Sequence, residues 1–265
     1  MSSGKVALVT GASRGIGARV AALLGQRGVH VLVAARQLDE CQVVADGIAA
    51  AGGAATAICL DVTDPLSIER AVSVGRAAAG HIGWLVNNAG VAVSAPLAAS
   101  DDELFGLHMR VNFDGARRVM QALLPEMVAA GSGSIVQVAS SAAIEGYPYV
   151  AAYCASKHAL LGYSRAAALE LLRKGVAVNV ICPHYVDSPM TTESIARIVE
   201  KTGKSEPQAR EFLAGQNPGG VLVTPEEVAE AVHAHLQGRR TGVVTELIGG
   251  AARTHSPGLE LPDQP

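Results

Sequence analysis

The stretch VALVTGASRGIG, residues 6–17, decides the fold of this chain. An apolar run typical of a buried strand leads directly into a glycine-rich turn, and a helical pattern follows as far as Arg27. Glycines at a strand-to-helix turn let the backbone approach a pyrophosphate, which then lies against the free N–H groups at the start of the helix. The spacing G-x-x-x-G-x-G at this first junction therefore favours nucleotide binding over a simple chain reversal.

The same alternation of strand and helix patterns continues to the end of the chain. Apolar runs rich in β-branched or small residues alternate with amphipathic segments that are long enough to be crossover helices. This pattern predicts an α/β fold, a doubly wound parallel sheet flanked by helices on both faces. We expect its strands at residues 6–10, 30–35, 55–60, 84–87, 134–139, 176–182 and 243–248.

Residues 1–250 are predicted to form one dinucleotide-binding and catalytic domain, because no linker-like stretch or internal repeat interrupts the alternation. Two regions depart from it. Residues 188–220 form a long polar insertion that contains glycines, and we interpret it as a substrate lid. Residues 251–265 are rich in proline and polar residues, and we expect a C-terminal tail there.

Composition limits the partners. A chain of 265 residues that is 49% hydrophobic can bury one large core, and its net charge of -3 with scattered basic residues argues against nucleic acid as a partner. No apolar run is long enough to span a bilayer, so we expect a cytoplasmic protein without a membrane partner. The four cysteines lack metal-type spacing, which predicts reduced core residues and no metal site: Cys41, Cys59, Cys154 and Cys182.

The segment Tyr153-Cys154-Ala155-Ser156-Lys157 carries a chemical pattern. In a helix, Tyr153 and Lys157 lie one turn apart on one face, which places an ammonium beside a phenol. The neighbouring charge should favour the phenolate and lower the tyrosine pKa from about 10 toward the range of general acid/base work. Taken alone, the pair is more typical of a solvated helix face than of a catalytic site.

Five motifs in register supply the missing context. TGASRGIG, Asp61-Val62 after the third strand, the NNAG turn at residues 87–90, Asn112, and Ser140 with Tyr153 and Lys157 occur in an order and spacing that resembles the short-chain dehydrogenase/reductase family of the classical type. The resemblance covers residues 4 to about 250. It implies a single Rossmann-like domain that uses a nicotinamide cofactor to interconvert an alcohol and a carbonyl.

The resemblance also implies catalytic roles for Asn112, Ser140, Tyr153 and Lys157. Tyr153 would act as the general acid/base, while Lys157 lowers its pKa and holds the nicotinamide ribose hydroxyls. Ser140 would bind the substrate oxygen; because side chains alternate along a strand, only one of Ser140 and Ser141 should face the crevice, and the family spacing selects Ser140. Asn112 would order a water next to the lysine, with a buried, satisfied amide as the alternative.

Cofactor contacts are predicted in the same way. Asp61 is available for the adenine amino group, since Thr63 or Asp64 can cap the next helix. Within the nicotinamide clamp, residues 182–188, His184 stands where relatives have glycine, and its role is open. The expected contacts are Gly11, Ser13, Arg14, Gly15, Ile16, Gly17, Arg36, Asp61, Val62, Asn88, Ala89, Gly90, Tyr153, Lys157, Pro183, Val186 and Ser188.

The end of the second strand predicts the choice of cofactor. Sites that prefer NAD place a carboxylate there for the ribose 2'-hydroxyl, but this chain has Ala35. Arg36 and Arg14 can converge on a 2'-phosphate from two sides, and Ser13 can add a hydroxyl. We therefore predict NADP(H), with NAD(H) as the alternative.

These inferences predict an NADP(H)-dependent carbonyl reductase or alcohol dehydrogenase, an oxidoreductase that transfers a hydride between NADP(H) and a carbonyl or secondary alcohol. A non-catalytic nicotinamide-nucleotide-binding sensor or scaffold is the alternative, and it gives no reason to keep all four catalytic residues. All five tyrosines lie in the span around the expected site, which suits an apolar small-molecule substrate. The alanine-rich helical segments 101–130 and 153–174 indicate a homotetramer or homodimer.

Overall fold

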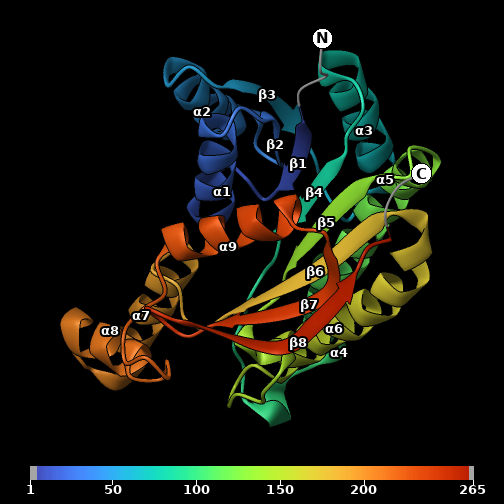
Figure 1. Cartoon of the computed structure of the whole chain (residues 1–265). Coiled ribbons are helices and arrows are strands. Elements are labelled where there is room, and N and C mark those ends of the chain that lie inside the picture. Colours follow the sequence, from blue (N-terminus) through green and yellow to red (C-terminus); the bar gives the residue numbers. More distant parts are fainter. Residues whose placement is uncertain (1–4, 263–265) are drawn as a thin grey trace.

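The structure is a computed structural model that describes residues 5–262, so the ends of two predicted ranges, residues 1–4 and 263–265, lie outside it. One sheet runs through the molecule in the strand order β3-β2-β1-β4-β5-β6-β7-β8 (Figure 1). Strands β1 to β7 are parallel, and β8 pairs with β7 in the antiparallel direction. The strands are β1 Val6–Thr10, β2 His30–Ala35, β3 Ala54–Cys59, β4 Trp84–Asn87, β5 Gly133–Val138, β6 Val176–Pro183, β7 Arg240–Leu247 and β8 Ala252–Glu260.

Helices cover both faces of the sheet, and the alternation of side chains along each strand divides the core between them. On β1, Ala7 and Val9 pack with α1, α2 and α9, whereas Val6 and Leu8 pack with α3, α5 and α6. The helices are α1 Gly15–Gln26, α2 Leu38–Ala50, α3 Pro65–Ala79, α4 Asp102–His108, α5 Ala116–Ala129, α6 Ala151–Leu171, α7 Pro189–Thr202, α8 Glu206–Ala214 and α9 Pro225–Gln237. A π-helical segment, Met109–Gly115, joins α4 to α5.

The strand order reverses direction between β1 and β4, since β2 follows β1 on one side and β5 follows β4 on the other. In an open parallel sheet, such a switch point leaves a crevice at the carboxyl ends of the strands, where ligands bind. The turns after β1, β4, β5 and β6 meet at this edge. The predicted α/β fold and all seven predicted strands are confirmed, with end points that differ by at most one residue in most of them.

Two predicted regions differ in structure from the expectation. Residues 188–220 contain the two helices α7 and α8, which lie beyond the carboxyl edge of the sheet (Figure 1), rather than a long loop. Within residues 251–265, the expected tail, Ala252–Glu260 forms β8. Gly249 and Gly250 have φ values of 87° and 72°, and this left-handed turn returns the chain alongside β7. Pro257 is tolerated because β8 is an edge strand.

Within residues 5–262, no helix has both the length and the apolar character that a membrane span requires. The four cysteines are free. Cys41 and Cys182 are buried, as predicted, but Cys59 is exposed and Cys154 is partly exposed, so the prediction of a core position is wrong for these two. They lie at the end of β3 and in the first turn of α6, where one face of the element reaches the surface.

Candidate active site

The glycine-rich turn is fixed to the turn that follows β4. Thr10 Oγ1 accepts hydrogen bonds from the backbone N–H groups of Asn88 and Ala89, at 3.0 and 3.1 Å. The Asn88 side chain donates in return to the carbonyls of Thr10 and Gly11, at 3.0 and 3.1 Å. The predicted cofactor contact Asn88 therefore also holds the two turns together.

Gly17 lies in the first turn of α1, where no larger residue fits. A Cβ atom there would lie 2.3 Å from the carbonyl oxygen of Gly11 and 2.6 Å from Asn88 Nδ2. The helix can therefore start directly behind the turn, with its free N–H groups directed toward the crevice. This is the close backbone approach that the glycine spacing predicts.

Helix α6 carries Tyr153 and Lys157 on one face, as the four-residue spacing predicts. Lys157 is 4% exposed, and its Nζ donates to the carbonyl oxygen of Val138, at the end of β5, at 3.0 Å. The same Nζ lies 5.7 Å from the centre of the Tyr153 ring. The lysine is thus fixed between the sheet and the tyrosine, rather than exposed on a solvated face.

The proton affinities of this pair differ from the prediction. Burial raises the pKa of Tyr153 to about 12, although the neighbouring Ser140 hydroxyl acts in the opposite direction. Burial also lowers the pKa of Lys157, to about 8. The expected lowering of the Tyr153 pKa is therefore wrong for this structure, because desolvation of the phenolate is the largest effect on it. Tyr153 is therefore a neutral phenol at neutral pH.

Ser140 and Ser141 line the same cavity, although only one was expected to do so. Strand β5 ends at Val138, and a 3₁₀ turn, Ser141–Ala143, begins directly after Ser140, so the alternation of a strand no longer applies. Ser140 Oγ accepts from the backbone N–H of Ala142 at 3.2 Å, which leaves its hydroxyl hydrogen available as a donor.

Asn112 lies in the π-helical segment and is 1% exposed. Its Oδ1 accepts from the N–H of Val91 at 2.8 Å, and its Nδ2 donates to the carbonyl oxygen of Val91 and to Ser156 Oγ, both at 3.0 Å. The side chain is therefore a buried, satisfied amide. It lies beside the cavity, since a Cβ atom on the lining residue Gly90 would lie 3.2 Å from Asn112 Oδ1 and 3.7 Å from Lys157 Nζ.

A cavity of about 790 Å³ brings many of the predicted residues together. All five tyrosines were expected around it: Tyr147, Tyr149, Tyr153 and Tyr185 do line it, whereas Tyr163 packs against Phe113 outside it. The predicted site residues that line it are Ile16, Asn88, Gly90, Ser140, Tyr153, Lys157, Pro183, Val186 and Ser188. The other predicted cofactor contacts lie outside the lining: Gly11, Ser13, Arg14 and Ala89 in the turns after β1 and β4, Gly15 and Gly17 in the first turn of α1, and Arg36, Asp61 and Val62 just after β2 and β3.

At the ends of β2 and β3, Ala35 leaves the position of the usual ribose carboxylate without an acid, and exposed Arg36 follows it. Asp61 Oδ1 accepts from the N–H and the hydroxyl of Thr63, at 2.8 and 2.7 Å. Burial opposes ionisation of Asp61, but these hydrogen bonds and the charge of Arg36 hold its pKa below the ordinary value. Asp64 caps α3, as one of the predicted alternatives.

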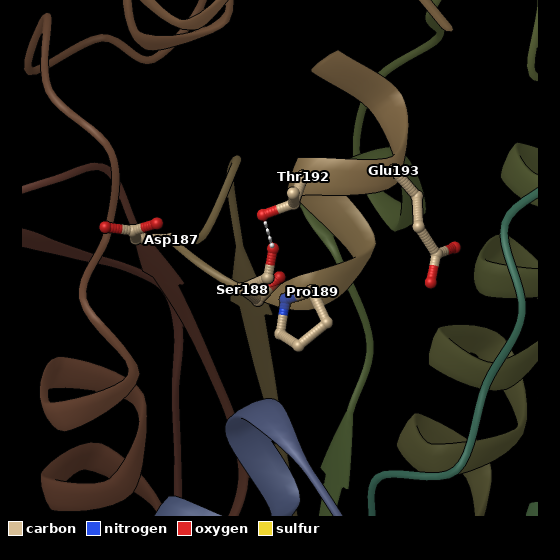
Figure 2. A pocket seen from close by; sticks show the side chains of 5 residues that line it. All are labelled: Asp187, Ser188, Pro189, Thr192 and Glu193. Carbon is tan, nitrogen blue, oxygen red and sulfur yellow. Dashed lines mark hydrogen bonds between the residues drawn. The ribbon is translucent and has the colours of Figure 1, made fainter. Parts of the chain in front are cut away.

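Helix α7 lies against the glycine-rich turn. A Cβ atom on Gly15 would lie 3.2 Å from Pro189 Cδ, and the exposed side chain of Arg14 pairs with Glu193 at 3.3 Å. Figure 2 shows the hollow at this junction, with Pro189 above the start of α1; its lining residues are Asp187, Ser188, Pro189, Thr192 and Glu193. The predicted nicotinamide clamp and the predicted phosphate-binding turn are therefore neighbours.

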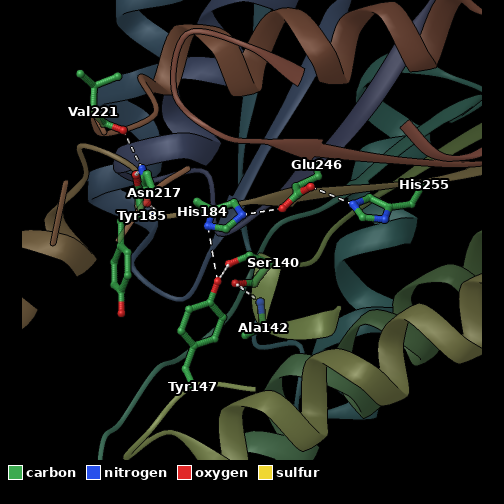
Figure 3. A network of polar contacts seen from close by, with 10 residues as sticks. Ser140, Ala142, Tyr147, His184, Tyr185, Asn217, Val221, Glu246 and His255 are labelled. Atoms are coloured by element: carbon green, nitrogen blue, oxygen red, sulfur yellow. Dashed lines mark hydrogen bonds and ion pairs between the residues drawn. The ribbon is translucent and has the colours of Figure 1, made fainter. Parts of the chain in front are cut away.

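Three polar residues continue the site away from α6 (Figure 3). His184 Nε2 lies 2.6 Å from Glu246 Oε1, and His255 Nε2 lies 2.8 Å from Glu246 Oε2. Glu246 is 2% exposed, and its pKa, which burial would raise, is held low by its hydrogen bonds to the two histidines. Sequence reasoning missed Glu246 and His255; a carboxylate within the apolar run of β7 was the available signal.

The residues present fit a nicotinamide nucleotide. The glycine-rich turn offers N–H groups for a pyrophosphate, the end of β2 lacks an acid and carries Arg36, and Lys157 lies where it can reach hydroxyl groups in the cavity. Ser140 and Tyr153 place two hydroxyls on one wall of that cavity. This arrangement can bind a carbonyl oxygen and give it a proton.

Comparison with known proteins agrees with this arrangement. The family model for short chain dehydrogenases matches residues 5–198. The 3-oxoacyl-[acyl-carrier-protein] reductase of Escherichia coli strain K12 is 34% identical, over 86% of this chain and 88% of the relative. A solved actinorhodin polyketide ketoreductase with NADPH superimposes with a TM-score of 0.89 at 33% identity, over 93% of this chain and 97% of the other. L-sorbose reductase from Gluconobacter frateurii, complexed with NADPH and L-sorbose, gives 0.87 at 28% identity, over 94% and 96%.

The family match covers most of the chain, and the relatives extend over nearly all of it. Together with the strand order and the placement of Ser140, Tyr153 and Lys157, these findings lead to one assignment. The chain belongs to the short-chain dehydrogenase family.

Proposed function

We propose that this protein is an NADP(H)-dependent oxidoreductase that interconverts a carbonyl group and a secondary alcohol, with Tyr153 as the general acid/base. The observation that carries the proposal is the single cavity in which Ser140, Tyr153 and Lys157 meet at the carboxyl end of β5. When bound, the nicotinamide nucleotide supplies or accepts the hydride. The relatives named above include a ketoacyl reductase and a sugar reductase, which supports a carbonyl substrate.

Each side chain has a distinct task in this reaction. The Ser140 hydroxyl, whose oxygen is already engaged by the N–H of Ala142, donates a hydrogen bond to the carbonyl oxygen. Tyr153 gives its phenolic proton to the oxygen on which negative charge develops, and takes it back in the reverse direction. Lys157, held by the carbonyl of Val138, binds the ribose hydroxyls of the cofactor.

The proton affinity of Tyr153 favours reduction at neutral pH. A phenol whose pKa is raised to about 12 carries its proton at pH 7 and is ready to donate it. Oxidation of an alcohol requires the phenolate, so its rate should increase as pH rises toward that value. We therefore propose carbonyl reduction as the direction that runs best near pH 7.

The choice of NADP(H) rests on charge at the ends of β1 and β2. Arg36 and Arg14 are exposed cations on two sides of the expected 2'-phosphate position, and Ala35 presents no carboxylate to repel it. A guanidinium donates charge-assisted, bidentate hydrogen bonds to a phosphate. The two solved neighbours that contain NADPH support the same choice.

The direct test screens a panel of ketones and alcohols while nicotinamide absorbance is followed. The panel should include cyclic ketones, 3-oxoacyl thioesters and ketose sugars. The proposal predicts oxidation of NADPH that depends on a ketone, with a higher kcat/KM than for NADH. Tight binding of NADPH without turnover of any panel member would instead support a nucleotide-binding sensor or scaffold.

We also propose that α7 and α8, within residues 188–220, act as a substrate lid. Residues of α7 line the cavity, among them Met190, Ser194 and Ile198. The two helices share a small apolar cluster of their own, around Ile195 and Leu213, which is separate from the cores of the sheet. Such a unit can move without disturbing the sheet. Hydrogen exchange should show slower exchange in α7 and α8 when NADPH and substrate are bound.

Assembly and location complete the proposal. We propose a homodimer or homotetramer that pairs the outer faces of α4, α5 and α6, where Leu169 is 67% exposed. A monomeric mass by light scattering at micromolar concentration would contradict it.

The four free cysteines favour a cytoplasmic location, which fractionation of the source cells would test.

A further inference from the structure

A polar corner interrupts the apolar lining of the cavity opposite α6. The Tyr147 hydroxyl lies 2.9 Å from Ser141 Oγ. It also lies 3.4 Å from His184 Nδ1 (Figure 3). All three residues line the cavity. The contact of 3.4 Å is longer than a strong O–H···N hydrogen bond, so the hydroxyl and the ring nitrogen both retain capacity for another partner.

Glu246 determines which edge of His184 faces this corner. The carboxylate is buried and ionised, and an ionised carboxylate only accepts hydrogen bonds, so His184 Nε2 must carry a proton toward it. The other nitrogen, Nδ1, then faces Tyr147. His184 is 7% exposed, and its ring is held by burial and by the 2.6 Å contact with Glu246.

Strand β8 supplies the partner that keeps Glu246 in place. His255 lies at a bulge, where Thr254 pairs with Thr245 and Ser256 pairs with Val244, so His255 is the extra residue of β8. The bulge directs its Nε2 to Glu246 Oε2, at 2.8 Å. Each carboxylate oxygen of Glu246 therefore contacts one histidine. His255 holds the carboxylate in place, and the carboxylate in turn holds His184.

The polar corner lies close to the expected position of the reacting carbonyl. Ser140, which binds that oxygen in the proposed function, is the chain neighbour of Ser141, and consecutive Cα atoms are about 3.8 Å apart. A ligand group that reaches Tyr147 and His184 therefore lies in the same part of the cavity as the carbonyl group. A hydroxyl suits this corner in either protonation state of His184, because it can donate to Nδ1 or accept from it while it contacts the Tyr147 hydroxyl.

We infer that Tyr147 and His184 bind a hydroxyl group that the substrate carries next to its carbonyl, and that Glu246 is the positioning residue that holds His184 for this contact. The substrate class is therefore a hydroxy ketone, or in the reverse direction a diol. The inference rests on the proposed function, since Ser140 defines where the carbonyl lies.

The test compares a matched pair of probes, 2-hydroxycyclohexanone and cyclohexanone, with NADPH. The measured quantity is the ratio of their kcat/KM values within one variant, because the fraction of correctly folded protein cancels from this ratio. A neutral hydrogen bond corresponds to about 2-fold to 13-fold, so the wild type should prefer the hydroxy ketone by about 10-fold. The ratio should fall to about 1 in Tyr147→Phe and part of the way in Glu246→Gln, which keeps the shape but not the charge.

Tyr163→Phe is the matched control, because it deletes a phenol hydroxyl from a tyrosine that packs on Phe113 outside the cavity. Its ratio should equal that of the wild type. A wild-type ratio near 1, or an unchanged ratio in Tyr147→Phe, would overturn the inference while leaving the proposed function intact.

A wild type that reduces neither ketone would count against the proposed function alone. The same comparison is then made by calorimetry with trans-1,2-cyclohexanediol and cyclohexanol. Preferential binding of the diol that is lost in Tyr147→Phe would support the hydroxyl site, and equal affinities would refute it.

Discussion

The site has a buried end, where Tyr153 and Lys157 line the cavity, and an exposed end outside the cavity, where Arg14 and Arg36 lie at the surface. Lys157 is 4% exposed and is hydrogen-bonded to the end of β5, but the side chain of Arg14 is 66% exposed and pairs with the exposed side chain of Glu193. Burial at the first end shifts pKa values strongly, while charges at the second end are screened by salt. The rate of the reaction should therefore depend on individual functional groups at the buried end. The preference for one cofactor should depend on several weaker contacts at the exposed end.

The largest effect should come from the buried end. Tyr153→Phe removes the proton donor and little binding surface, so kcat with NADPH should fall by about 10²-fold to 10⁴-fold, while NADPH affinity stays within a few fold. Steady-state kinetics and calorimetric titration measure the two quantities, and Tyr163→Phe serves as the control. Activity near that of the wild type in Tyr153→Phe would refute the assigned mechanism.

The next effect concerns the exposed end. A hydrogen bond to a charged group contributes about 1.5–3 kcal/mol, so Arg36→Ala should weaken NADPH binding by about 10-fold to 150-fold and barely affect NADH. The loss should shrink as ionic strength increases, because Arg36 is exposed. Adding Ala35→Asp should reverse the preference. Equal losses for both cofactors would mean that Arg36 does not contact the 2'-phosphate.

The buried charge of Lys157 should reduce stability. Its pKa falls from 10.5 to about 8 on folding, which corresponds to a cost of about 3 kcal/mol while the group is charged in both states. Lys157→Met also deletes the bond to Val138, so we expect a net gain of about 1–3 kcal/mol in the free energy of unfolding at pH 7, together with loss of activity.

The pH dependence of that gain in stability distinguishes between two causes, removal of a buried charge and better packing. The folded protein binds fewer protons than the unfolded chain between pH 8 and 10.5, so the wild type recovers stability as pH rises through this window. The advantage of Lys157→Met should be complete below pH 8 and should disappear toward pH 10.5. Urea unfolding at pH 7 and at about pH 10 measures it, and an advantage independent of pH would point to packing instead.

The smallest effect should come from the ion pair between Arg14 and Glu193. Both side chains are exposed, so Glu193→Gln should change the free energy of unfolding by less than about 1 kcal/mol. Release of Arg14 toward the 2'-phosphate should tighten NADPH binding by about 2-fold to 5-fold, without an effect on NADH. Weaker NADPH binding in this variant would show that Glu193 positions Arg14 rather than competes for it.

The two ends also differ in how well the sequence predicts them. Spacing placed Ser140 at the end of a strand and Tyr153 and Lys157 on one helix face, because apolar runs define the buried strands and a four-residue step returns to the same face; the family resemblance then singled out these three residues. The direction of the pKa shift of Tyr153 was not predictable, since it depends on how completely the folded chain removes water from the phenol. The same holds for Ser141, which a 3₁₀ turn brings into the cavity beside Ser140.

The C-terminal region was least predictable. Strand β8 is an exposed edge strand with proline and charged residues, so it lacks the apolar pattern that identifies an inner strand. Glu246 and His255 come together only through the bulge between β7 and β8. In contrast, α8 had a readable start, because Ser205 and Gln208 form a capping box.

One measurement tests the central claim most directly, that the protein transfers a hydride from NADPH to a carbonyl carbon with Tyr153 as the proton donor. NADPH carrying deuterium at both C4 positions is incubated with each ketone of the panel, and the alcohol product is analysed by mass spectrometry. The account predicts one deuterium on the carbinol carbon with the wild type, and only traces of this product with Tyr153→Phe. An alcohol without deuterium, or a Tyr153→Phe variant that forms the labelled alcohol at the wild-type rate, would contradict it.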